Sequence, residues 1–359
     1  MIAEMGGKIK TKMCYAHIKG CQYCTYSIRD GQIFCGFRDS RSAPGNGRQV
    51  ALWAAGGTNG AAQNSLTGLW TWIRLRLMNK RVIINADDFG LCSGVNRAIA
   101  QAHIEGVLRS ATIMANMPSA QEAVEIAKAN RNLGIGVHLN LSEGRPLSKN
   151  NGMDALLDGD GQFACSAFRL FALCLAGRRI RTAIRAELAA QIQWVIDMGL
   201  RPTHLDSHKH IHALPVVFRI VCELARDFGI GAVRWTFEPR GVCRPPWPAV
   251  GEGGRKRAGL IRPLARINRM QKPGLLKTKA FFGIAHTGKI DISFFKAVTL
   301  YNSAAIAEVM THPGYADGLD PDKTRLVDQR KAELDALCSE RTKQYFRDAK
   351  IELVHYGQL

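Results

Sequence analysis

The feature that most constrains the fold is a regular alternation of strand and helix patterns that begins near Arg81. Short apolar runs of strand length alternate with longer segments in which apolar residues recur at helical spacing. The expected strands cover 81–87, 111–116, 134–140, 203–208, 232–235, 308–312 and 351–356. The clearest expected helices cover 93–106, 119–130, 181–199 and 215–229. Repeated strand–helix–strand units predict parallel strands with right-handed crossovers, arranged as an open sheet or as a barrel.

The first 77 residues do not share this pattern. They are rich in Gly, Ser, Asn and Cys, whereas Met78 opens a short basic lead into a buried strand. We therefore expect an N-terminal extension over 1–77, which is disordered or a start-site artefact, and a functional domain over 78–359. Within the extension, Cys21 and Cys24 form half of a zinc-ribbon pattern. Because a second close pair is missing, we favour free thiols over structural zinc.

Cysteine usage and hydropathy bear on the compartment. The ten cysteines have irregular spacing, which is not typical of a disulfide framework. No run of about 18 apolar residues predicts a transmembrane helix, and the N-terminus lacks the apolar core of a secretory signal. We expect a cytoplasmic protein.

The formal net charge of +19 suggests a polyanionic partner. Positive charge is densest between Arg244 and Lys279, where Glu252 is the only acid, and a second cluster is Arg178, Arg179, Arg181 and Arg185. Solvated faces and a mobile loop are one interpretation, and peripheral contact with the anionic inner face of a membrane is the other. Few aromatic residues interrupt the first block, so it does not favour a surface that stacks single-stranded nucleic acid.

Polar side chains cluster where several expected strands end. Asp87 and Asp88 end the first strand, His138 ends the third, and His312 follows a late one. The stretch THLDSHKHIHALP over 203–215 supplies five more side chains, His204, Asp206, His208, His210 and His212. On a strand this spacing of two would point all five the same way. Because sites in β/α folds gather at the carboxyl ends of the strands, we expect these clusters to converge on one rim.

Each cluster taken alone has a simpler explanation. Asp87 and Asp88 would suit a turn that caps the next helix, and His138 would suit a satisfied core histidine. The stretch 203–215 would suit a surface patch that titrates near neutral pH. Convergence favours a divalent metal instead, because Asp88, His138 and His208 make a facial set with open positions. A neighbouring carboxylate then acts as base toward water.

Four motifs in order resemble those of the YdjC/ChbG-like carbohydrate deacetylases, including members associated with hopanoid biosynthesis. They are NADDFG, GVHLNL, THLDSHKHIHALP and EVMTHPG. The resemblance runs from about Arg81 to the C-terminus. It implies an α/β fold, a deformed (β/α) barrel of about seven strands, that removes acetyl groups from N-acetylated sugars with one divalent metal ion.

The resemblance also implies roles by motif position. Asp88, His138 and His208 would bind the metal, and Asp87 would be the general base. His312 would donate a proton to the departing amine or stabilise the oxyanion. The remaining residues of the histidine stretch would orient ligands or contact substrate, and these are His204, Asp206, His210 and His212. Mg²⁺ and Zn²⁺ are the metals we favour, with Co²⁺ and Fe²⁺ as alternatives.

The expected substrate is an N-acetylglucosamine-type sugar on an oligosaccharide or a glycolipid. The basic block favours a lipid-linked acceptor near the inner face of a membrane, and oligomerisation stays open.

A glycosidase would need two carboxylates about 5 to 10 Å apart across the sugar, which adjacent Asp87 and Asp88 match poorly. A nucleic-acid-binding protein with an N-terminal Cys module would leave the histidines without a role. No glycine-rich phosphate loop follows a strand, so no nucleotide cofactor is expected.

Overall fold

The computed structural model describes residues 12–14, 24–29, 32–37, 80–148, 152–271 and 274–359. The chain divides into two compact units, Met1–Trp72 and Ile73–Leu359. In the first unit, three short antiparallel strands are described, β1 (Lys12–Cys14), β2 (Cys24–Arg29) and β3 (Gln32–Phe37), with β2 in the middle. Cys21 and the predicted domain boundary after residue 77 lie outside the described residues.

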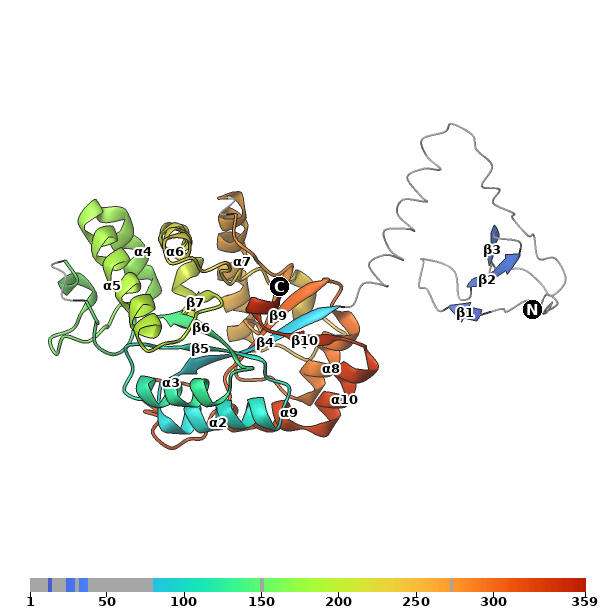
Figure 1. Cartoon of the computed structure of the whole chain (residues 1–359). Helices are drawn as coiled ribbons and strands as arrows, with labels where there is room; N and C mark the ends of the chain where they lie inside the picture. Colours follow the sequence, from blue (N-terminus) through green and yellow to red (C-terminus); the bar gives the residue numbers. More distant parts are fainter. Residues whose placement is uncertain (1–11, 15–23, 30–31, 38–79, 149–151, 272–273) are drawn as a thin grey trace, which may run out of the picture. The chain divides into compact units, whose positions relative to one another are not determined.

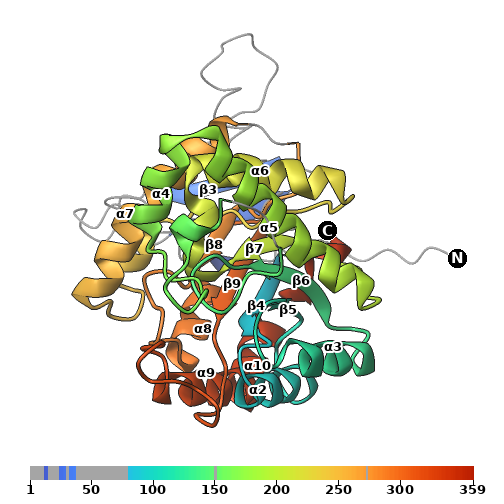
Figure 2. The ribbon, with the colours of Figure 1, turned by 90° about the vertical axis from the view of Figure 1, so that its left-hand side faces the viewer.

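The second unit is built around a parallel sheet that curls into a half-barrel and is surrounded by helices (Figures 1 and 2). Its strand order is β7 (Leu205–Ser207), β6 (Gly134–Leu139), β5 (Ser110–Ile113), β4 (Arg81–Phe89), β9 (Ile306–Thr311) and β8 (Ala280–Phe282). β10 (Glu352–Val354) pairs with the first half of β4, and β5 pairs with the second half. The prediction of an α/β protein with a deformed barrel of about seven strands is confirmed.

The sheet is irregular between β7 and β8. The strand expected over 232–235 forms only single bridges there, including one from Val233 to Leu205. The backbone N–H of Phe281 in β8 donates to the carbonyl of Phe237 at 3.1 Å. β8 itself was not predicted, because its apolar run is only three residues long and is followed by Gly283. This irregular side is what makes the barrel a deformed one.

Helices surround the curled sheet in two groups, one below it and one above it in Figure 1. Those on the lower side in Figure 1 are α2 (Ser93–Ile104), α3 (Ala120–Ala129), α8 (Ile292–Tyr301), α9 (Asp328–Cys338) and α10 (Glu340–Asp348). Those on the upper side are α4 (Ala167–Ala176), α5 (Arg178–Asp197), α6 (Pro215–Asp227) and α7 (Glu252–Met270). Most of the basic block forms α7, so its interpretation as a mobile loop is wrong. Among the described residues, no helix has the length and apolar character needed to cross a membrane.

Alternate residues of the strands separate an apolar core from a polar interior. Val82, Ile84 and Ala86 of β4 belong to the main hydrophobic core. Asn85 and Asp87 point the other way, and the amide Nδ2 of Asn85 donates to Oδ1 of Asp87 at 2.9 Å. One face of β4 therefore contributes to the hydrophobic core, and the opposite face carries the polar side chains.

We predict that Ile84→Ala lowers the free energy of unfolding by about 2–5 kcal/mol, because Ile84 is fully buried in the core. Leu300→Ala, at an exposed position of α8, is the control and should change stability by less than about 0.5 kcal/mol. Urea unfolding of the full chain followed by circular dichroism measures both. Equal effects would contradict this placement of the core.

Candidate active site

A cavity of about 1010 Å³ opens at the carboxyl ends of the strands. Its lining includes side chains at or just after the carboxyl ends of β4, β6, β7 and β9. Six of the residues singled out in the sequence line it, namely Asp87, Asp88, His138, His208, His210 and His312. The volume is sufficient for a small ligand such as a sugar.

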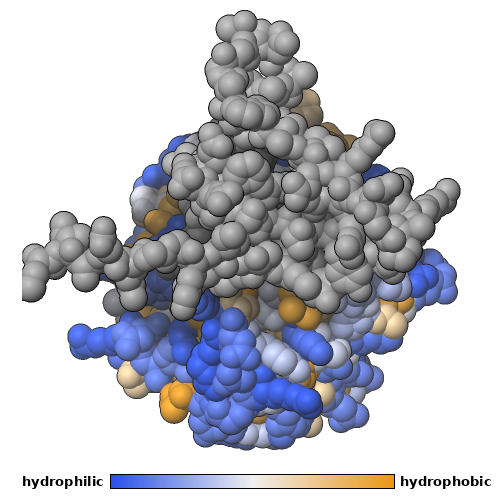
Figure 3. Space-filling view, turned by 90° about the vertical axis from the view of Figure 1, so that its right-hand side faces the viewer, coloured by the Kyte–Doolittle hydropathy of each residue, from blue (hydrophilic) through white to orange (hydrophobic). Residues whose placement is uncertain are grey.

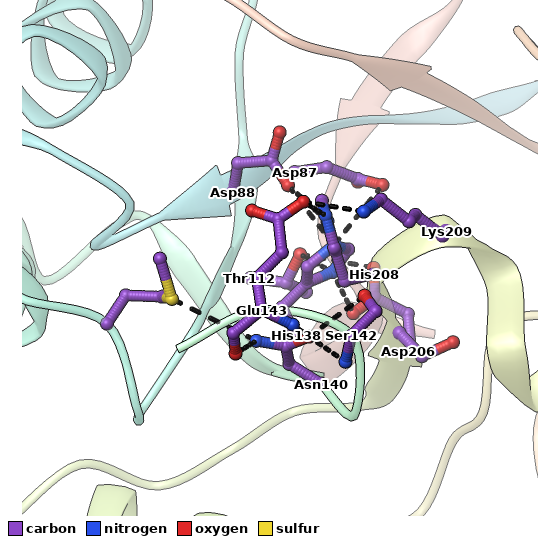
Figure 4. Close-up of polar contacts among 12 residues, drawn as sticks. Asp87, Asp88, Thr112, His138, Asn140, Ser142, Glu143, Asp206, His208 and Lys209 are labelled. Atoms are coloured by element: carbon purple, nitrogen blue, oxygen red, sulfur yellow. Dashed lines mark hydrogen bonds and ion pairs between the residues drawn. The ribbon is translucent and has the colours of Figure 1, made fainter. Parts of the chain in front are cut away.

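Two consecutive carboxylates reach this cavity because the end of β4 is irregular. In a regular strand, neighbouring side chains point to opposite faces. The pairing of β4 with β5 shifts register between Ala86 and Phe89, and Asp88 adopts a left-handed backbone with φ of 67°. The irregularity turns Asp88 toward the same cavity as Asp87 (Figure 4).

Asp88, His138 and His208 form a set whose potential ligand atoms all lie within 4.8 Å of one another. Nδ1 of His208 is 2.9 Å from Oδ1 of Asp88, and Nε2 of His138 is 3.5 Å from the same oxygen. The three side chains come from different elements and all border the cavity. One carboxylate and two imidazoles are a donor set that fits a divalent cation and leaves coordination positions open.

A carboxylate contacts the other ring nitrogen of each of these two histidines. Nδ1 of His138 is 2.7 Å from Oδ1 of Asp206, and Nε2 of His208 is 3.2 Å from Oε1 of Glu143 (Figure 4). Such contacts fix the orientation of a ligating ring. They leave Nε2 of His138 and Nδ1 of His208 facing Asp88. Glu143 also accepts from Lys209 Nζ at 2.6 Å, which ties its loop to the segment after β7.

Arg234 connects the buried carboxylates beneath the site. Its Nη1 and Nη2 each donate to an oxygen of Asp87 at 2.7 Å. Nη1 also lies 2.8 Å from Oδ2 of Asp206, and Nε donates to Oε1 of Glu308 at 2.8 Å. In the second possible metal set, Asp87, His138 and Asp206, both carboxylates are therefore already paired with this guanidinium. Burial acts to raise the pKa of Asp87, but Arg234 and His138 outweigh it and lower that pKa well below 3.8.

Helix α9 supplies two more buried groups. Nη2 of Arg330 donates to Oδ2 of Asp88 at 2.6 Å, so Oδ1 of this carboxylate is left for the histidines. Burial acts to raise the pKa of Asp88, but Arg330 and His208 hold it well below 3.8. Glu333 accepts the backbone N–H of His312 at 2.6 Å, and its Oε2 is 3.9 Å from His312 Nδ1.

His312 is neutral near pH 7. Burial lowers its pKa to about 4, although Asp88 and Asp87 act in the opposite direction. Its Nδ1 has no hydrogen-bond partner within the described residues. His312 therefore borders the cavity, and among the described residues its buried Nδ1 is left without a hydrogen bond.

The histidine stretch does not point in one direction, so that expectation is wrong. The strand ends at Ser207, and the 3₁₀ segment η2 (His208–Ala213) follows, with left-handed backbone at Lys209 and His210. His210 lines the cavity, while His212 lies deeper, with its Nδ1 2.5 Å from Oγ of Ser207. His204 and Asp206, like His212, do not line the cavity. Asp206 lies behind His138, and the His204 ring stacks on Tyr356 at 4.1 Å between centroids.

Sequence reasoning missed the residues that hold the site together. Arg234 had a usable signal, because an arginine in the apolar run AVRW is buried only if it is paired. Arg330 and Glu333 had none, since their helix carries charges at many positions. Glu143 lies in a loop after β6, where no periodicity marks it.

Known proteins resemble most of this chain. The YdjC-like protein family matches residues 81–348. A carbohydrate deacetylase of Brevibacillus brevis is 33% identical over 280 residues, covering 78% of this chain and 99% of that protein. A carbohydrate deacetylase of Geobacillus stearothermophilus is 32% identical over 283 residues, covering 78% and 98%.

One solved structure shares the fold. It is a cellobiose-phosphate cleavage protein of Enterococcus faecalis V583, with a TM-score of 0.63 and 23% identity, covering 78% of this chain and 98% of that one. With the family match over residues 81–348, the chain belongs to the YdjC-like family.

Proposed function

We propose that this chain is a metal-dependent hydrolase that removes the N-acetyl group from an N-acetylglucosamine-type sugar. The observation that carries the proposal is the set of Asp88, His138 and His208 beside Asp87 at the polar end of a sugar-sized cavity. The relatives named carbohydrate deacetylase support the same reaction.

Asp88, His138 and His208 are the proposed metal ligands. A divalent cation held there would supply an acidic water and would polarise a carbonyl, since such ions lower the pKa of bound water from ~15.7 to roughly 7. Two imidazoles favour Zn²⁺, Co²⁺ or Fe²⁺ over Mg²⁺, which prefers oxygen ligands. Of the two metals favoured from the sequence, this set of ligand atoms therefore favours zinc.

Asp87 is the proposed general base. Arg234 holds both of its oxygens, so the carboxylate has a fixed orientation, and its lowered pKa keeps it ionised at neutral pH. An ionised carboxylate at the cavity wall accepts a proton from the attacking water. A cation at the neighbouring site would make the water acidic enough for this weakly basic carboxylate to accept its proton.

His312 is the proposed donor to the developing oxyanion. As a neutral ring, it donates a hydrogen bond to negative charge rather than a proton to the leaving amine. Glu333 fixes the backbone of His312 from the side away from the cavity. Of the two roles expected from the sequence, the buried environment therefore supports oxyanion stabilisation.

The acceptor is proposed to be a sugar carried on a lipid, encountered at the cytoplasmic face of a membrane. Above its polar end, the cavity has an extensive apolar wall that includes Leu91, Phe171, Ile261, Leu264 and Ile284. The lipid part of a glycolipid would bury more apolar area against such a wall than a free oligosaccharide would. Soluble oligosaccharides sharing the same sugar remain substrates for the polar end.

The glycosidase alternative is less well supported. It needs two carboxylates on opposite sides of the sugar. Asp87 and Asp88 are chain neighbours on one side of the cavity, and each is paired with a buried arginine.

We predict that the full chain releases acetate from N-acetylglucosamine oligomers or glycolipids only with a divalent metal, and that a chelator abolishes release. His208→Ala should reduce metal-dependent release by more than the ~100-fold typical of losing an indirect contact. His103→Ala, at the end of α2 and outside the cavity, is the control and should retain activity. New reducing ends without acetate would show a glycosidase instead.

We predict that Asp87→Asn lowers kcat by about 10²- to 10⁴-fold, because the amide cannot accept the proton from water. Metal affinity should change little, since Asp87 is held by Arg234 and lies outside the proposed ligand set. Steady-state kinetics and calorimetric metal titration measure the two effects. Loss of metal binding with the loss of activity would assign Asp87 to the ligands.

We predict that Asp206→Asn weakens metal affinity by about 10- to 100-fold, because the carboxylate orients His138. Glu308→Gln is the matched control, since Glu308 also pairs with Arg234 but does not touch the proposed ligands. Its metal affinity should stay within a few-fold of the unchanged chain. Thermal unfolding of both variants measures the loss of stability that each suffers when a carboxylate partner of Arg234 is removed. Equal loss of affinity in both would contradict a specific role for Asp206.

A further inference from the structure

We propose that α4 and α7 form a docking face for an anionic phospholipid bilayer beside the mouth of the catalytic cavity. The inference deepens the proposed function, since it takes this cavity as the sugar site. It assigns the acceptor to the membrane surface and names the residues that bring the cavity there.

Most residues that helix α7 buries are small, whereas its most exposed apolar side chains are large. The buried positions are Gly254, Ala258, Ala265 and Asn268. Leu260 and Met270 are 71% and 79% exposed, and Ile267 is exposed as well. Residues 260, 267 and 270 recur at helical spacing, so they form one outward stripe. A water-facing helix normally has the opposite arrangement, which indicates a partner with an apolar interior.

Basic residues flank this stripe. Arg255, Lys256, Arg266 and Arg269 are exposed on α7. Glu252, the only acid between 244 and 279, pairs with Lys256 at 2.7 Å. A helix with an apolar stripe beside arginines and lysines is typical of helices that lie in the interface of anionic membranes.

Helix α4 repeats the arrangement. Leu170 and Cys174 face the core, whereas Phe168 is 83% exposed and Leu175 is exposed one to two turns further on. Arg169 is the only charged residue of this helix, and exposed Arg178 and Arg179 follow directly after it. α4 therefore also offers an apolar stripe with a basic fringe.

Both helices border the same cavity. Phe168 and Phe171 of α4 line it, as do Leu260, Ile261 and Leu264 of α7. Figures 1 and 2 place α4 and α7 on the same side of the sheet. The apolar stripes thus continue into the cavity wall that leads to the metal-ligand set. By contrast, the coloured surface in Figure 3 is mainly hydrophilic, with scattered apolar residues.

Charge selects the bilayer over a second copy of the chain. Two copies that met through this face would bring Arg255, Arg266 and Arg269 of one against those of the other, which like-charge repulsion opposes. An anionic bilayer complements the same arginines and takes up the apolar side chains. A bilayer-docked cavity would receive a sugar whose lipid remains in the membrane.

Flotation of the full chain with vesicles tests the proposal. Vesicles of phosphatidylcholine with phosphatidylglycerol should bind the chain, those of phosphatidylcholine alone should bind it much less, and added salt should weaken binding. The triple variant Leu175→Gln, Ile267→Gln and Met270→Gln should lower the partition coefficient by at least about tenfold. Ile104→Gln with Leu300→Gln is the matched control, because both positions are exposed but lie on α2 and α8.

A second arm tests the charges. Arg255→Gln with Arg266→Gln should lower vesicle binding by about fivefold for each arginine. Arg131→Gln with Arg341→Gln, at exposed positions near α3 and on α10, is the charge-matched control. Equal binding by α4/α7 variants and controls would overturn the proposal. So would a monomer–dimer equilibrium that the triple variant abolishes, since this would make a second copy the occupant.

Acetate release from a soluble N-acetylglucosamine oligomer should be unchanged in all of these variants, because none of the substituted residues lines the cavity. This readout separates the two proposals. Normal release with unaltered vesicle binding would overturn only the docking face. Absence of release from the unsubstituted chain would overturn the proposed reaction.

Discussion

The contact on which the rest of the site depends is the guanidinium of Arg234 among the buried carboxylates of Asp87, Asp206 and Glu308. Three carboxyl groups in a barrel interior would be very costly to bury without a cation to pair with them. Arg234 comes from the irregular segment between β7 and β8, while its partners lie on β4, β7 and β9. The same contact therefore stabilises the irregular side of the barrel and orients Asp87. Through Asp206 it also orients His138, so fold and site share one network.

The sequence predicted that the motif residues lie together, but not the network behind them. The motif residues could be placed together because parallel strands bring their carboxyl ends to one rim. The paired carboxylates Asp87 and Asp88 needed more than that rule, since only an irregular strand end lets neighbours share a cavity. The histidine stretch misled for a related reason. Its spacing of two suits a strand, but left-handed backbone at Lys209 and His210, which no glycine marks, turns the chain.

Helix α7 is a second element that its sequence did not predict. Gly251 precedes it, Gly253 and Gly254 lie in its first turn, and Pro263 lies inside it, which together are typical of a loop. The helix forms because small side chains let it pack closely: a Cβ at Gly254 would lie only 2.1 Å from the carbonyl oxygen of Ala285. The proposed chemistry and the proposed choice of acceptor are thus assigned to different parts of the fold. Strand ends hold the candidate catalytic groups, and α4 with α7 line the same cavity with apolar side chains.

The proposed binding of one divalent cation by Asp88, His138 and His208 can be observed directly. Anomalous diffraction from crystals soaked in Zn²⁺, measured on both sides of the zinc absorption edge, tests it most directly. We expect a single strong peak in the cavity, at coordination distance from Oδ1 of Asp88, Nε2 of His138 and Nδ1 of His208. A peak bound instead by Asp87 and Asp206, or no peak in this cavity at saturating zinc, would contradict the account.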